Sequence, residues 1–117
     1  VDAGRWDLVG RSLRIRGEPG SALEGPKSSA GLCDFLEANG LAVERGICEI
    51  PTAFRATSGS GAPRIAFVAE YDALPGVGHG CGHNIIGTAS CAAGIAVAVL
   101  VHNWTPIQLR TAALPAS

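Results

Sequence analysis

Two histidines and a cysteine lie close together in the run His79-Gly80-Cys81-Gly82-His83. A thiolate and a neutral imidazole are good ligands for zinc and similar divalent ions. Cys81 and His83 are two positions apart, so both side chains can point toward one cation if the loop is extended. The intervening glycines remove side-chain bulk and permit unusual backbone angles. We therefore predict that Cys81 and His83 are metal ligands, although a zinc site needs at least three ligands from protein.

Two acidic residues, Glu70 and Asp72, precede this run. A ligand imidazole usually donates its second ring N–H to a carboxylate or a carbonyl, so either residue could orient a histidine. The less favoured interpretation is that both are ordinary charges at the end of a strand. His79 has two comparable interpretations, as a residue beside the metal or as a hydrogen-bond partner of the backbone. The pattern indicates a metal site but leaves the roles of Glu70 and His79 open.

Cys81 also permits a second chemistry, in which its thiolate is a nucleophile and a neighbouring histidine is the base. Two histidines within two residues of one thiol suit a metal better. The other cysteines are predicted to be small buried hydrophobic residues, namely Cys33, Cys48 and Cys91. The N-terminus has no hydrophobic signal-peptide segment, so we expect a cytoplasmic protein with free thiols.

The elements that must position this loop follow from apolar periodicity, glycines and prolines. Residues 1–16 and the segment from Pro26 to Asn39 predict helices, and a third helix is expected over 85–101. Strands are expected at 42–46, 52–57 and 64–69. The last strand is a continuous apolar run, typical of a strand covered on both faces. This order indicates an α/β fold, with the 72–84 loop at the carboxyl edge of the sheet, where ligands bind.

Composition excludes several classes of function. The 117 residues are enough for one domain, and a net charge of −1 gives no electrostatic reason to expect nucleic acid or membrane partners. The apolar run 85–101 is about the minimum length for a membrane span. Glycine, serine and threonine interrupt it, so a buried core helix is the favoured interpretation.

Two motifs resemble a known family. Ala-Glu-Tyr-Asp-Ala-Leu-Pro at residues 69–75 and His-Gly-Cys-Gly-His-Asn at 79–84 are similar to the zinc amidohydrolases related to aminoacylase and carboxypeptidase G. The most similar branch contains p-aminobenzoyl-glutamate hydrolase and β-alanyl-lysine dipeptidase. Segments 27–30, 34–36, 43–46 and 51–56 also resemble that branch, so the resemblance covers about residues 24–101.

The resemblance implies a zinc-peptidase-like, three-layer α/β catalytic domain with two metal ions, zinc or manganese. Cys81 would bridge the ions, His83 would bind one of them, and Asp72 would stand beside the centre without binding metal. The implied reaction is hydrolysis of an amide bond in a small N-acyl amino acid or dipeptide, with a glutamate as general base. Members of the family are expected to be homodimers.

Parts of the family pattern are missing from this sequence. The family places a Glu-Glu pair on the strand and loop after the 85–101 helix, and no such pair occurs after residue 70. We therefore expect the N-terminal part of a larger domain: a divergent segment 1–25, a partial catalytic domain 26–101 and a tail 102–117 without family match. The alternative is an inactive truncated fragment that associates with a full-length relative. The isolated chain is expected to self-associate, because its apolar helix lacks cover.

Overall fold

A computed structural model describes residues 4–20, 25–100 and 107–111. The chain order is helix α1 (Arg5–Gly17), helix α2 (Pro26–Ala38), strand β1 (Ala42–Arg45), a 3-10 turn (Ile47–Glu49), strands β2 (Phe54–Ser58) and β3 (Ile65–Ala69), helix α3 (His83–Leu100) and strand β4 (Ile107–Thr111). All the helices and strands predicted from the sequence form, and their limits differ by a few residues. Strand β4 was not predicted.

The four strands form one mixed sheet in the order β1-β2-β4-β3. β1 pairs with β2 and β2 with β4 in antiparallel fashion, whereas β3 and β4 are parallel, with Ala69 opposite Thr111. Helix α3 makes the connection between these two parallel strands. The carboxyl ends of β3 and β4 therefore lie side by side at one edge of the sheet, next to the loop that carries the predicted site.

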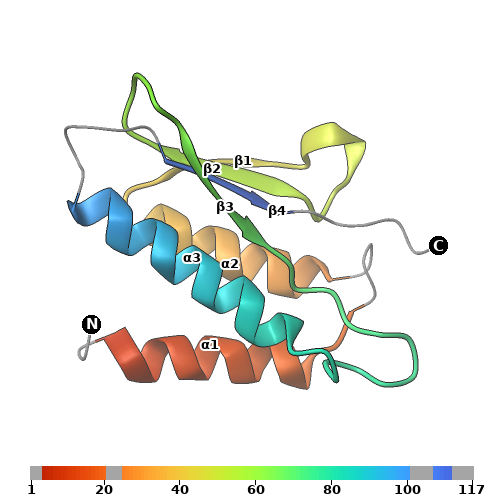
Figure 1. The fold of residues 1–117 in the computed structure, drawn as a ribbon. Coiled ribbons are helices and arrows are strands. Elements are labelled where there is room, and N and C mark those ends of the chain that lie inside the picture. The colour runs from red at the N-terminus through yellow and green to blue at the C-terminus, as the bar shows by residue number, and fades with distance from the viewer. Residues whose placement is uncertain (1–3, 21–24, 101–106, 112–117) are drawn as a thin grey trace.

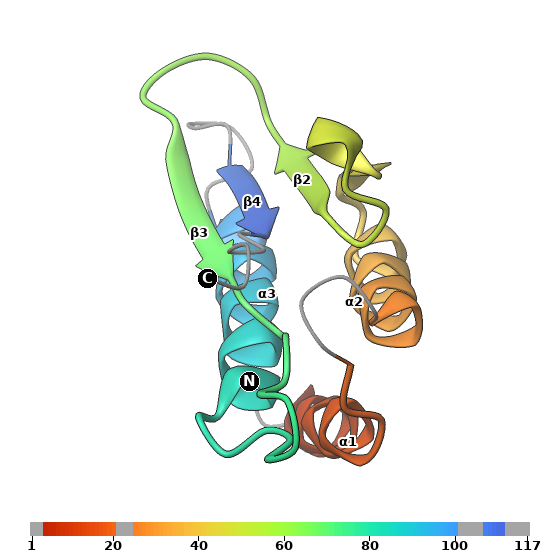
Figure 2. The same ribbon diagram turned by 90° about the vertical axis from the view of Figure 1, so that its right-hand side faces the viewer.

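The helices form two layers on one side of the sheet (Figure 1). α2 contacts β1 and β2, α3 contacts β3 and β4, and α1 packs on the far side of both helices. Figure 2 shows α1 beneath α3, away from the strands. The hydrophobic core lies between these layers, and its largest fully buried side chains are Phe54, Leu32, Leu36, Cys33 and Cys91.

The expectation that β3 is covered on both faces is wrong for this chain. Phe67 and Ala69 pack toward the core, but Val68 is 52% exposed and Ala66 is exposed as well. The apolar composition of β3 shows that its residues can be buried. It does not show whether other elements pack on both faces of the strand. In the described part of the molecule, the outer face of β3 is bare.

α3 is held close to the sheet by a stripe of small residues. The buried positions of this helix include Gly87, Cys91, Gly94 and Ala98, whose spacing places them along one side. By length and composition α3 could also cross a membrane, with a mean hydropathy of 1.6. Its contacts with α1, β3 and β4 bury one side, as expected of a core helix, but only 33% of its residues are buried. One side of α3 nevertheless remains bare, since Ile85 is 62% and Val99 71% exposed.

Candidate metal centre

The site begins where β3 ends at Ala69 and the chain turns away through Glu70, Tyr71 and Asp72. Tyr71 anchors this turn. Its hydroxyl donates a hydrogen bond to the carbonyl oxygen of Thr52, and its ring stacks on Phe54 at 6.3 Å between centroids. Burial is the main cause that raises the pKa of Tyr71, so the phenol keeps its proton and the hydrogen bond at neutral pH. These contacts hold the backbone of the turn on which Glu70 and Asp72 lie.

The glycine-rich loop that follows is folded rather than extended. Leu74 and Gly78 form a small bridge through backbone hydrogen bonds of 2.9 Å in both directions, and Gly76 completes the turn with a φ of 72°. A second turn joins the backbone N–H of Gly82 to the carbonyl oxygen of His79, at 3.2 Å. The loop is therefore a pair of tight turns ending at the start of α3.

His83 is the first residue of α3 and meets both acidic residues. Its Nδ1 lies 2.7 Å from Oδ1 of Asp72 and 3.1 Å from the Asp72 carbonyl oxygen. Its Nε2 lies 3.3 Å from Oε2 of Glu70. All three side chains are partly exposed, at 22% for His83, 29% for Asp72 and 30% for Glu70. The structure thus brings together three residues singled out from the sequence, in a place that solvent and ions can reach.

Cys81 lies in the turn before α3 and is exposed. The loop does not take the extended form in which the side chains of Cys81 and His83 would alternate, because Cys81 is in a turn and His83 is in a helix. Exposure leaves the Cys81 thiol accessible to a cation. Within the ranges that the structure covers, no three His, Cys, Asp or Glu side chains are arranged to hold a metal ion by themselves.

The residues present therefore fit part of a metal site. Three groups are suitable donors for zinc or manganese: the exposed thiol of Cys81, the His83 imidazole and the Glu70 carboxylate near its Nε2. The Asp72 carboxylate already holds the imidazole at Nδ1. A complete site needs further ligands or a shift of the Cys81 turn.

The two predicted roles of His79 stay open. Both of its ring nitrogens are buried and lack a hydrogen-bond partner in the described structure. Burial is the main cause that lowers the pKa of His79, the backbone of Ile15 opposes this shift, and the nearby His83 adds to it. The surroundings of the ring therefore disfavour its charged form.

The other cysteines follow the prediction in two cases out of three. Cys33 and Cys91 are fully buried, and burial raises the pKa of Cys91 to about 12. Cys48 is exposed, because it lies in the short 3-10 turn with a positive φ of 56°. The prediction of a buried Cys48 is therefore wrong. All four cysteines are free thiols, as expected.

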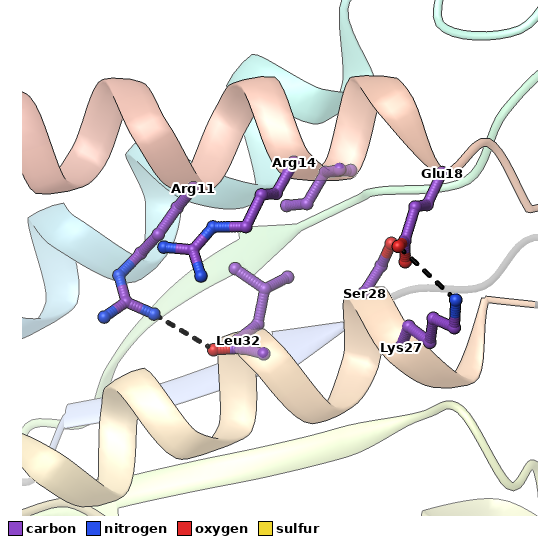
Figure 3. Close-up of a pocket in the computed structure, with 8 residues that line it drawn as sticks. Arg11, Arg14, Glu18, Lys27, Ser28 and Leu32 are labelled. Atoms are coloured by element: carbon purple, nitrogen blue, oxygen red, sulfur yellow. Dashed lines mark hydrogen bonds and ion pairs between the residues drawn. The ribbon is translucent and has the colours of Figure 1, made fainter.

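A separate pocket of about 160 Å³ lies between α1 and α2 (Figure 3). Arg11, Arg14 and Lys27 line it together with Glu18, which forms an ion pair with Lys27 at 3.4 Å. None of the predicted metal-site residues lines this pocket, so it is distinct from the loop centre.

The fold is that of a known class of metallopeptidase. Over 94% of its length the chain superposes on a dinuclear metal-binding peptidase of the M20 family from Bacillus subtilis, with a TM-score of 0.83 and 16% identity, and it covers 35% of that chain. A structure from methicillin-resistant Staphylococcus aureus, described as a putative aminohydrolase, gives a TM-score of 0.79 at 18% identity, with 32% of that chain covered. The predicted fold class, a partial α/β catalytic domain, is confirmed.

Sequence comparison identifies the branch. The chain is 38% identical to one of the subunits of p-aminobenzoyl-glutamate hydrolase from Escherichia coli, over 83% of this chain and 24% of the relative. It is 34% identical to the human Xaa-Arg dipeptidase, over 83% of this chain and 25% of the relative. No family model matches the sequence. The chain is homologous to part of these hydrolases, which confirms the predicted family, and it spans about a quarter of their length.

Proposed function

We propose that this chain contributes the Cys81 and His83 part of a two-metal site to a hydrolase that cleaves an amide bond in a small N-acyl amino acid or dipeptide. The observation that carries the proposal is the contact between Asp72 and His83, at 2.7 Å, because a carboxylate that orients an imidazole is typical of metal-binding histidines. The names of the relatives support an amide substrate. Zinc or manganese, homodimeric assembly and a cytoplasmic location remain part of this proposal.

A bound divalent metal would supply Lewis-acid activation of the scissile carbonyl and of water. The chain's own residues would hold it. Asp72 fixes the His83 ring, Tyr71 fixes the backbone between the two carboxylates, and Cys81 presents an exposed thiol in the turn before the helix.

Metal binding by the purified chain tests the proposal directly. We expect the wild type to bind Zn²⁺ and a Cys81→Ser variant to bind it at least about tenfold more weakly, because a thiolate ligand is lost. Cys48→Ser is the matched control, since Cys48 is also exposed but lies in the turn after β1. Equal Zn²⁺ affinity of the wild type and Cys81→Ser would refute the role of Cys81.

One observation favours a second candidate, a metal-binding chain without turnover. The family resemblance places the general base on the strand and loop after the long helix, and β4 is the strand in that position. β4 itself, residues 107–111, contains neither glutamate nor aspartate. Assays of the purified chain with Zn²⁺ or Mn²⁺ on p-aminobenzoyl-glutamate and on dipeptides ending in arginine separate the two candidates. Chelator-sensitive turnover would favour the first, whereas metal binding without turnover would favour the second.

A further inference from the structure

The two carboxylates at His83 face different ring nitrogens. Asp72 faces Nδ1 through its side chain at 2.7 Å and through its carbonyl oxygen at 3.1 Å. Glu70 faces Nε2 at 3.3 Å. The two acidic residues therefore stand on opposite sides of one imidazole, which allows them different roles.

Nδ1 of His83 is the nitrogen that carries the proton. Both groups of Asp72 that face it are hydrogen-bond acceptors, so Nδ1–H donates to them. The 2.7 Å separation is the length expected of a charge-assisted hydrogen bond. In the neutral ring the lone pair is then on Nε2, and this nitrogen is the one available to a cation.

The distance between Nε2 of His83 and Oε2 of Glu70 is longer. At 3.3 Å it exceeds the roughly 2.7–2.9 Å of a charge-assisted hydrogen bond. Two ligand atoms about 2.1 Å from one tetrahedral zinc ion lie roughly 3.4 Å apart. The spacing between Glu70 and His83 therefore matches that of two ligands of one ion better than that of a direct hydrogen bond.

We propose that Glu70 is itself a metal ligand, sharing one divalent cation with Nε2 of His83, while Asp72 only orients the ring. This inference rests on the proposed function and adds Glu70 to the residues that hold the metal. Glu70 precedes the anchored Tyr71, so the backbone that carries its partly exposed carboxylate is held in place. The exposed thiol of Cys81, in the turn before α3, offers a further ligand.

Co²⁺ binding, followed by visible absorption, separates a ligand from an orienting residue. We expect Glu70→Ala to weaken Co²⁺ binding about tenfold or more and to change the positions of the cobalt bands, because the ligand set changes. Asp72→Asn is expected to weaken binding about 10–100-fold and to leave the bands in place, because the ligands stay the same. Glu37→Ala, which removes an exposed carboxylate from α2, is the matched control with unchanged affinity.

Folding of each variant is checked by circular dichroism, and Glu70→Gln provides a variant of equal size. We expect Glu70→Gln to bind Co²⁺ with intermediate affinity, because its carbonyl oxygen can still bind but carries no charge. Unchanged affinity and bands in Glu70→Ala, with binding lost in His83→Ala, would overturn the role of Glu70 and leave the proposed function intact. A wild-type chain that binds no Co²⁺ would overturn both.

Discussion

Gly87 of α3 lies directly against the backbone of Glu70. A Cβ atom at this glycine would stand 3.0 Å from the Glu70 carbonyl oxygen and 3.0 Å from Cβ of Tyr71. Both neighbours are rigid, and both belong to the segment that carries the candidate site. The absence of a side chain at Gly87 therefore sets how closely the start of α3, with His83, approaches the end of β3.

Gly87→Ala is expected to destabilise the fold and disturb the site. Alanine gains roughly 1 kcal/mol of helix propensity, but forcing a methyl group into a packed contact costs about 1–3 kcal/mol. We expect a net loss of about 1 kcal/mol in the free energy of unfolding, measured in urea, and weaker metal binding. Gly31→Ala in α2 is the control, because a Cβ there meets nothing within 4 Å. If Gly87→Ala and Gly31→Ala had the same free energy of unfolding, the contact of position 87 with Glu70 and Tyr71 could relax without cost.

Asp72→Asn is expected to weaken Zn²⁺ binding without unfolding the chain. Asparagine keeps an acceptor near Nδ1 of His83 but loses the charge that holds the ring through the 2.7 Å contact. Loss of an orienting partner of this kind costs about 10–100-fold in metal affinity. Isothermal titration calorimetry measures the change. Asp34→Asn serves as the control, since Asp34 of α2 forms an exposed ion pair with Arg45. If Asp72→Asn bound Zn²⁺ as tightly as this control, the orienting role of Asp72 would be contradicted.

The sequence predicted most elements because local signals mark their ends. Pro26 begins α2, and Gly40, with a φ of 83°, ends it, as the Asn-Gly pair indicated. β4 has the alternation Ile107-Gln108-Leu109, but this strand is short and no turn signal isolates it. Its position between β2 and β3 depends on the long α3 connection, and local patterns do not specify such pairing.

The sequence predicted that an acidic residue contacts a histidine, but it did not predict the geometry of that contact. Residue types alone indicated that Asp72 or Glu70 could orient a histidine, and the 2.7 Å contact between Asp72 and His83 agrees with this. Which nitrogen faces which carboxylate depends on the path of the chain between β3 and α3. That path is fixed by packing at Tyr71 and Gly87, far apart in the sequence, and no local pattern encodes it.

The buried thiol of Cys91 makes the fold sensitive to alkali. Burial raises the pKa of this thiol to about 12, with Cys33 adding to the effect. In the unfolded chain the pKa of a cysteine thiol is about 8.5. Above that pH the unfolded state loses protons that the folded state keeps, so the free energy of unfolding falls by up to about 1.4 kcal/mol per pH unit.

Cys91→Ala is expected to reduce this pH dependence. Urea unfolding at about pH 7 and about pH 10.5, on either side of the thiol's pKa in the unfolded chain, should show a smaller loss of stability in the variant than in the wild type. Part of the decrease in the free energy of unfolding with pH should remain, because burial also raises the pKa of Cys33. The exposed Cys48→Ser variant should keep the wild-type slope. Identical slopes for Cys91→Ala and wild type would contradict the prediction.

An apolar groove between α1 and α3 is expected to make the isolated chain self-associate. It has a volume of about 310 Å³, and its rim includes Val9, Leu13 and Ile85, which are 43%, 57% and 62% exposed. Apolar surface gathered in one place favours association, because each Å² removed from water contributes about 25 cal/mol.

Sedimentation velocity over a range of concentrations tests this expectation. The double variant Leu13→Gln/Ile85→Gln should shift the chain toward monomer, since two polar amides would have to be desolvated in the contact. Val68→Gln is the comparison, because Val68 is 52% exposed on the bare outer face of the sheet. A stronger effect of Val68→Gln than of the double variant would place the contact on the sheet, and a monomeric wild type at all concentrations would refute self-association.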